Sequence, residues 1–209
     1  MRRATPDGRS TTIDDISKPH SPEAYAPEHR VADVILVLDA LEIDRAHFWG
    51  YSMGGRVGFD LEVYCRERLL SLVLGGAHPF GTQPNLAWAE QLRQGMPAFL
   101  AAKEAAISAL PRELLDRWLA NDPEALAAAA LADRPSLEAD VSSVYLPTLI
   151  YCGERDFAYE GARRAAEVMP NATFAGLPGL DHNGVVVAPE VVVPHGRTFL
   201  ASLAASQVA

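Results

Sequence analysis

A serine with glycines on both sides is the feature of this sequence whose residue types and spacing point most directly to chemistry. Residues 50–55 read Gly-Tyr-Ser-Met-Gly-Gly, between a strand-like apolar run at 46–50 and a helix-like run that begins at Met53. A sharp turn from a strand into a helix can lift the Ser52 side chain clear of the backbone. Small residues suit such a turn because it is tight and the helix packs close to the sheet. The pattern also arises by chance in loops, so it predicts a nucleophile only if the chain supplies a base and an acid.

Two later residues lie where the partners of a nucleophilic serine are expected. In open sheets of alternating strands and helices, active residues gather beyond the carboxyl ends of the strands. Asp156 lies four residues after a predicted strand that ends at Cys152, and His182 lies in a predicted glycine-rich loop, 176–184, after the last predicted strand. A hydroxyl needs a base that takes its proton, and the base needs an acceptor that fixes its tautomer. We therefore predict Ser52 as nucleophile, His182 as base and Asp156 as acid.

Other residues compete for these roles. His78 also follows a predicted strand end, so it is either a rival base or a residue that lines the cleft. Asp181 directly precedes His182, but neighbours in a chain rarely turn their side chains toward one another. Asp156 has an alternative interpretation as a turn residue that caps the next helix, and His182 as an ordinary loop histidine. The remaining histidines lie away from the predicted carboxyl ends of strands: His20, His29, His47 and His195.

The elements that must position these residues alternate between helix and strand with short connections, which is typical of a parallel sheet. Between 78 and 140 the sequence is rich in Ala, Leu, Glu and Arg and lacks β-branched runs, which predicts four or five short helices. We therefore predict an α/β fold in three parts. Residues 1–77 form the N-terminal part of the core with Ser52, residues 78–140 a helical insertion, and residues 141–209 the C-terminal part of the core.

The apolar pattern of the first helix, which begins near Pro27, indicates one buried face. Its members are Val31, Val34, Ile35, Val37, Leu38 and Leu41. The other expected elements of the core are strands at 46–50, 69–74, 148–152 and 173–175, and helices at 53–67, at 160–169 and from 189 or 194 to 203.

The composition excludes several classes of protein. Of the 209 residues, 49% are hydrophobic and 22% are charged, which allows one sizeable core. The formal net charge of −9 argues against a nucleic-acid partner, because nucleic-acid binders carry a basic stripe. Since no apolar run is long enough to span a bilayer and none follows the basic start as in a signal peptide, we expect no membrane partner and a cytoplasmic location.

The two cysteines, Cys65 and Cys152, are far apart and form no C-x-x-C pair, so they give no zinc or redox signature. Both are expected as buried free thiols, which fits a reducing compartment. We expect neither a metal nor a cofactor.

With these motifs placed, the chain resembles the α/β-hydrolase superfamily and is most similar to its single-domain branch of enol-lactonases, small esterases and cofactor-free haloperoxidases. The resemblance covers roughly residues 27 to 203 and rests on the serine turn Gly50–Gly55, the acid turn Gly153–Asp156 and the histidine segment Leu177–His182. It implies a mostly parallel sheet flanked by helices, with the insertion 78–140 as a cap over the site. It also implies that the backbone N–H of Met53 helps to hold an oxyanion.

The resemblance also implies strands, and a His-Gly loop with a second oxyanion donor, ahead of residue 27. The sequence has no His-Gly pair there, and only Asp7–Ser10 resembles the end of a family segment. We therefore expect an N-terminally truncated core. Its exposed sheet edge beside Phe48 and Trp49 would be open to pairing with a second copy of the chain, which makes a homo-oligomer possible.

The function implied by the resemblance is a serine hydrolase that acts on small carboxylic esters or related acyl compounds through an acyl-enzyme. One alternative keeps the same residues but replaces water by hydrogen peroxide, giving a perhydrolase of the cofactor-free haloperoxidase type. Another is a truncated homologue that binds a ligand without turnover. Tyr51 and His78 are candidates for substrate contact. Three aromatic residues of the insertion either line the cleft or pack between helices: Trp88, Phe99 and Trp118.

Overall fold

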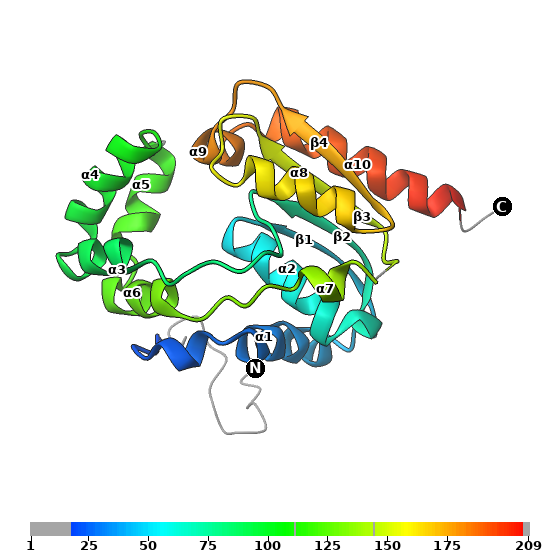
Figure 1. Cartoon of the computed structure of the whole chain (residues 1–209), viewed down its shortest axis with the longest axis horizontal. Coiled ribbons are helices and arrows are strands. Elements are labelled where there is room, and N and C mark those ends of the chain that lie inside the picture. Colours follow the sequence, from blue (N-terminus) through cyan, green and yellow to red (C-terminus); the bar gives the residue numbers. More distant parts are fainter. Residues whose placement is uncertain (1–17, 111, 144, 207–209) are drawn as a thin grey trace.

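The structure of the chain, a computed structural model, describes residues 18–110, 112–143 and 145–206 (Figure 1). Its centre is a sheet of four parallel strands in the order β1-β2-β3-β4, with helices on both faces. The predicted parallel sheet with flanking helices is therefore confirmed. In chain order the elements are η2 (Pro22–Tyr25), α1 (Pro27–Ala40), β1 (Ala46–Tyr51), α2 (Met53–Tyr64), η3 (Arg66–Arg68), β2 (Leu69–Gly75), α3 (Leu86–Arg93), α4 (Met96–Ala106), α5 (Arg112–Leu119), α6 (Pro123–Leu131), α7 (Glu138–Val141), β3 (Thr148–Gly153), α8 (Tyr159–Val168), β4 (Ala172–Leu177), α9 (His182–Val186) and α10 (Pro189–Ser206).

The central strands β2 and β3 are apolar along their length because both of their faces are covered. Successive side chains of a strand point to opposite faces. Leu72, Leu74 and Ile150 pack in the cluster that includes side chains of α1, α2 and α8. Val73 and Leu149 point the other way, into the cluster formed with α9 and α10. A continuous apolar run is what a parallel strand buried on both faces requires.

The strand register brings the carboxyl ends of the four strands to one edge of the sheet. The last paired positions are Tyr51 with Gly75, Gly75 with Tyr151, and Gly153 with Leu177. The segments that leave β1, β3 and β4 therefore start from the same edge, which is where ligand sites of such sheets form.

Helices α3 to α6 lie beside this edge and pack around an apolar cluster of their own (Figure 1). Within it the Phe99 ring lies 5.4 Å from that of Trp88 and 6.2 Å from that of Trp118. The two connections to the core run together, since the N–H of Thr82 donates to the carbonyl of Arg134 at 3.1 Å. Helix α7 differs from the others, because its Val141 packs in the cluster of α1, α2 and α8.

Arg56 on α2 fixes both of these connections to the core. Its guanidinium donates to the carbonyls of Pro79 and Phe80 on one connection and of Pro135 on the other, at 2.7 to 3.3 Å. Its Nε also donates to Asp60 at 3.2 Å, within the same helix. A guanidinium is suited to this position because it presents five donors in a fixed plane.

The predicted buried face of α1 was too wide. Val31 and Leu38 are buried, and the exposed fraction is 58% for Val37 and 63% for Leu41. At 3.6 residues per turn, Val37 is rotated by roughly 240° from Val31, so the two cannot share a narrow stripe. Leu41 comes after the last helical residue, Ala40, where the helical period no longer applies.

Strand β1 is an edge strand of the sheet within the described residues. The Trp49 ring is covered on one side by Gly196 of α10, where an added Cβ would lie 2.2 Å from the ring. Its Nε1 donates to the Tyr151 hydroxyl at 3.1 Å. Pairing of a second copy along β1 stays a prediction, as does the cytoplasmic location. Within the described part of the chain, every helix is too short or too polar to cross a membrane.

Glu62 on α2 is a buried ionisable residue, and its burial predicts how the stability of the fold depends on pH. Its side chain is fully buried, and neither carboxylate oxygen has a hydrogen-bond partner among the described residues. Burial raises the pKa of Glu62 to about 8, against a smaller opposing effect of Arg66. In the unfolded chain this carboxyl titrates near 4.5. Between these values only the unfolded state releases the proton, so the free energy of unfolding falls as the pH rises from 5 to 8.

Glu62→Gln is expected to flatten this pH dependence by roughly 3 kcal/mol between pH 5 and pH 8, because the amide has no proton to release. The measurement is urea unfolding at both pH values. Glu190→Gln makes the same substitution at an exposed position of α10 and is expected to leave the dependence as it is. Equal pH dependence in Glu62→Gln and the native chain would contradict the assignment.

Candidate active site

Ser52 lies at a strained turn between β1 and α2. Its φ of 55° and ψ of −114° are unusual for a residue with a side chain and cost about 1–3 kcal/mol. Its N–H donates to the Gly75 carbonyl at 2.8 Å, which holds the turn against β2. An added Cβ at Gly50 would lie 2.3 Å from the Gly54 carbonyl oxygen, and one at Gly55 would lie 2.7 Å from the Gly75 carbonyl oxygen. An added Cβ at Gly54 would meet no atom within 4 Å. The prediction that the turn requires small residues is therefore wrong at Gly54.

The structure brings Ser52, His182 and Asp156 together in one line of hydrogen bonds. The Nε2 of His182 lies 2.8 Å from the Ser52 Oγ, and its Nδ1 lies 2.7 Å from the Asp156 Oδ2. The carboxylate accepts the proton on Nδ1, and this leaves Nε2 free to accept the hydroxyl proton of Ser52. The arrangement can therefore activate a serine as a nucleophile.

Asp156 also makes the contact that its alternative interpretation requires. Its Oδ1 accepts the N–H of Ala158 at 2.9 Å, just before α8. One oxygen thus shapes the turn while the other faces His182. The contact with Ala158 is the one that the turn interpretation requires, and the role of Asp156 as acid stays a prediction.

His182 begins the short helix α9, and the prediction of a loop at this position was wrong. Asp181 caps this helix, because its Oδ1 accepts the N–H of Gly184 at 2.8 Å. The acid turn and the histidine segment are also joined directly. The N–H of Arg155 donates to the carbonyl of Leu180 at 2.9 Å.

The Tyr51 hydroxyl contacts both His182 and Asp156. It donates to the His182 carbonyl at 2.8 Å and lies 3.3 Å from the Asp156 Oδ2. The two rings of Tyr51 and His182 lie 5.1 Å apart. Burial and the nearby Asp156 charge raise the pKa of Tyr51, so the hydroxyl keeps its proton and remains a donor. Tyr51 also borders the cavity described next, and its predicted contact with substrate stays a prediction.

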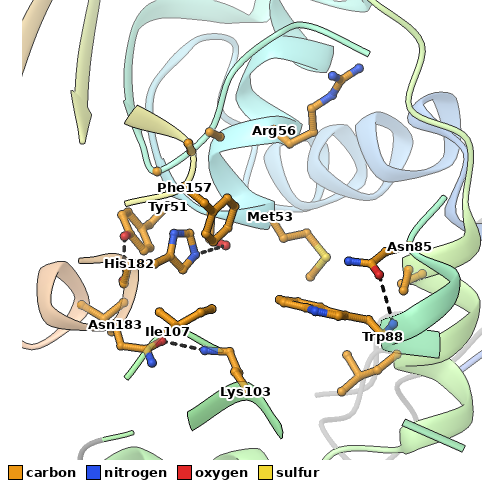
Figure 2. Close-up of a pocket in the computed structure, with 18 of the residues that line it drawn as sticks. Tyr51, Met53, Arg56, Asn85, Trp88, Lys103, Ile107, Phe157, His182 and Asn183 are labelled. Atoms are coloured by element: carbon orange, nitrogen blue, oxygen red, sulfur yellow. Dashed lines mark hydrogen bonds between the residues drawn. The ribbon is translucent and has the colours of Figure 1, made fainter. Parts of the chain in front are cut away.

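A cavity of about 740 Å³ lies between the serine and the helices α3 to α6, and Ser52 and His182 both border it. Figure 2 shows Phe157 and Met53 near His182, with Trp88 across the cavity. Trp88 and Trp118 border the cavity and also contact Phe99 within the helical cluster. These aromatic residues therefore both line the cavity and pack between the helices.

His78 borders the cavity too, but no hydrogen bond joins it to Ser52 in the described residues. Its ring lies 5.5 Å from that of Phe80, and its Nδ1 is buried without a hydrogen-bond partner among the described residues. Burial lowers the pKa of His78, which favours the neutral ring. His78 therefore borders the cavity, and it makes none of the hydrogen bonds that join Ser52, His182 and Asp156.

Met53 is the first residue of α2, so its backbone N–H has no acceptor within its own helix. The positive end of the helix dipole lies at the same place, which favours a negative charge beside Ser52. A role of this N–H in holding an oxyanion stays a prediction. The segment Asp7–Ser10 lies outside the described residues. In the described part of the chain, no group of three or more His, Cys, Asp or Glu side chains is placed to hold a metal ion.

Comparison with known proteins gives a consistent match. The profile of the family described as "Alpha/beta hydrolase family" matches residues 4–195. A putative carbamate hydrolase, RutD of Pseudomonas syringae, is 28% identical over an alignment of 207 residues. The alignment covers 87% of this chain and 77% of the relative. The 2-succinyl-6-hydroxy-2,4-cyclohexadiene-1-carboxylate synthase of Salmonella paratyphi C is 32% identical over 204 residues, with 83% and 77% covered. Among solved structures, a thermophilic esterase of Thermogutta terrifontis is 25% identical with a TM-score of 0.74, covering 85% of this chain and 73% of that one.

Proposed function

The chain belongs to the alpha/beta hydrolase family, and from this premise we propose that it is a serine hydrolase of carboxylic esters or related acyl compounds. The observation that carries the proposal is the pair of contacts made by His182, 2.8 Å to the Ser52 Oγ and 2.7 Å to the Asp156 Oδ2. A serine, a histidine and a buried carboxylate in this geometry are the parts that a nucleophilic hydroxyl needs.

In the first half of the proposed reaction, the Ser52 Oγ attacks the acyl carbon while the Nε2 of His182 takes the hydroxyl proton. The Asp156 carboxylate stabilises the imidazolium that forms, and the Met53 N–H donates to the oxyanion. His182 then returns the proton to the leaving oxygen as the ester bond breaks. An acyl group remains on Ser52.

In the second half, water attacks the acyl carbon and His182 takes a proton from it. Collapse of the new tetrahedral intermediate breaks the bond to the Ser52 Oγ, which receives that proton from His182. The acid product leaves and the serine is restored. Hydrogen peroxide in place of water would give a peracid by the same steps. Bromination of monochlorodimedone that depends on acetate and on Ser52 would assign peroxide as the acceptor.

Two of the three relatives named above support the proposed substrate class. One is an esterase and the other a putative carbamate hydrolase. Esters and carbamates both present a carbonyl carbon to a nucleophile. The cavity beside Ser52 is bordered by apolar and aromatic side chains, interspersed with polar groups that would orient such a substrate.

Rapid mixing with p-nitrophenyl acetate tests this proposal. We expect a fast release of about one p-nitrophenol per chain as Ser52 is acylated, followed by slower turnover. A chain that binds ligands without turnover gives neither phase. Release no faster than that of Ser52→Ala would contradict the proposal.

Tyr51→Phe is expected to lower kcat/KM for p-nitrophenyl acetate by about threefold to tenfold. It removes a hydroxyl that holds the His182 backbone and faces Asp156, and one such hydrogen bond contributes about 0.5–1.5 kcal/mol. Tyr145→Phe removes an exposed hydroxyl and is the matched control. Equal kcat/KM for Tyr51→Phe and the native chain would show that the hydroxyl does not position the base.

A further inference from the structure

The sequence contains two lysines, and one of them is buried beside the candidate active site. Lys18 is exposed, whereas the exposed fraction of Lys103 on α4 is 5%. The Nζ of Lys103 donates to the Asn183 Oδ1 at 2.6 Å, and Asn183 directly follows His182 on α9 (Figure 2). A cation of the helical cluster is thus held next to the base of the proposed reaction.

No carboxylate among the described residues forms a salt bridge or hydrogen bond with Lys103. Its hydrogen-bond acceptor among the described residues is the neutral amide of Asn183, and its Nζ also lies 5.1 Å from the centre of the Trp118 ring. An ammonium has three N–H donors, so this environment uses only part of its capacity. Burial lowers the pKa of Lys103, and the more distant Asp181 opposes this effect only in part. A bound anion would offset the cost of burying this charge.

The charge around the cavity has the opposite sign to the charge of the whole chain. The formal net charge of the chain is −9, yet no Asp or Glu among the described residues borders the cavity. The charged residues that border it are basic: Arg56, Lys103, Arg117 and Arg134. A cavity lined by one sign of charge and walled by apolar groups concentrates ligands of the other sign.

The other cations of this set are paired with a carboxylate or are less buried than Lys103. Arg56 pairs with Asp60 and with the connections of the helical cluster. Arg134 is half-buried and Arg117 is exposed. Among the described residues that border the cavity, Lys103 is therefore the buried cation without a carboxylate partner.

We infer that Lys103, positioned by Asn183, binds a carboxylate carried by the acyl substrate, a few bonds from the carbonyl that Ser52 attacks. The inference rests on the proposed function. It narrows the substrate class to acyl compounds with a negative charge near the bond that is cleaved. The positive charge of Lys103 contributes binding affinity for the carboxylate, and the hydrogen bond to Asn183 fixes the position of the ammonium group relative to His182.

A purely structural role is the competing interpretation. The Asn183 Nδ2 also donates to the carbonyl of Ser108 at 2.8 Å and to its Oγ at 3.2 Å, so Asn183 joins α9 to the segment that follows α4. If Lys103 only strengthens this junction, its loss affects charged and neutral substrates alike.

The test compares monomethyl esters of succinic, glutaric and adipic acid with their neutral dimethyl esters, with acid release followed in a pH-stat. For at least one chain length, we expect the native chain to prefer the anionic monoester by tenfold or more in kcat/KM. Lys103→Met is expected to lower kcat/KM for that monoester by about 10- to 100-fold, the range for a hydrogen bond to a charged group, and thus to remove the preference. Lys18→Met removes the same charge from an exposed site and should keep the native ratio.

Two results would overturn the inference: no preference in the native chain at any chain length, or an equal loss for both esters in Lys103→Met. Thermal unfolding checks that Lys103→Met is folded. Calorimetric binding of monomethyl glutarate to Ser52→Ala, with and without Lys103→Met, tests the anion site in the absence of turnover. Labelling of Ser52 by a fluorophosphonate without any preference for anions would overturn the anion site alone. Lys103-dependent binding without labelling would overturn the hydrolase proposal alone, and the absence of both results would overturn both.

Discussion

Ser52→Ala is expected to lower kcat for p-nitrophenyl acetate by about 10⁵- to 10⁶-fold, because the methyl group cannot form the acyl-enzyme. The His182 ring would still lie beside position 52, but it would have no hydroxyl proton to accept. The fold should tolerate the change, since the hydrogen bond that the Ser52 side chain makes among the described residues is the one to His182. Steady-state kinetics with circular dichroism of the variant would measure both effects.

His182→Ala and the double variant with Ser52→Ala are expected to lose about as much as Ser52→Ala alone, because residues that act as one unit are not additive. Ser142→Ala, which alters an exposed serine after α7, is the matched control and should keep native activity. If Ser52→Ala retained more than a few per cent of the native rate, the reaction would not pass through this serine.

Asp156→Asn is expected to lower kcat by about 10³- to 10⁴-fold, through the tautomer of His182. The Asp156 Oδ1 accepts the N–H of Ala158 at 2.9 Å, and the carbonyl oxygen of an asparagine would keep that bond. The amide NH₂ would then face His182, where the Oδ2 now lies 2.7 Å from Nδ1. An NH₂ donor there requires Nδ1 to be an acceptor, so the ring proton moves to Nε2. The histidine could then no longer accept the proton of Ser52.

Asp181→Asn provides the control for this prediction. Asp181 is adjacent to His182 in the chain, but its carboxylate caps α9 through Gly184. An asparagine is also a good cap, so a loss of less than tenfold is expected. Similar losses in the two variants, or a loss below tenfold in Asp156→Asn, would contradict the assigned acid.

The meeting of Ser52, Asp156 and His182 could be predicted from the sequence because it depends on few physical rules. Parallel strands bring their carboxyl ends to one edge, so residues that follow different strands converge there. The three strands were visible as short apolar runs, and the connections after them are short. Even so, the helix that begins at His182 was missed. Asp181 was a usable signal for a helix start, because aspartate is a preferred residue at the N-cap.

Other features depend on tertiary packing that a helical pattern does not reveal. Lys103 lies in an alanine-rich segment, where a lysine predicts an exposed face, yet it is buried between Asn183 of α9 and the Trp118 ring of α5. Glu62 lies on a helix that packs against the sheet on one side and against α1 and α7 on others, so little of α2 faces solvent. Val37 shows the reverse error, since an apolar residue in a periodic helix was assigned to a buried face that it does not reach.

Labelling with a fluorophosphonate probe tests the central claim most directly, because the probe reacts with serines that a neighbouring base has activated. Intact-mass analysis and peptide mapping of the folded chain would locate the adduct. We predict one adduct per chain on Ser52, and its loss in Ser52→Ala and in His182→Ala. A folded chain with no adduct on Ser52, or with its adduct on another serine, would contradict the account.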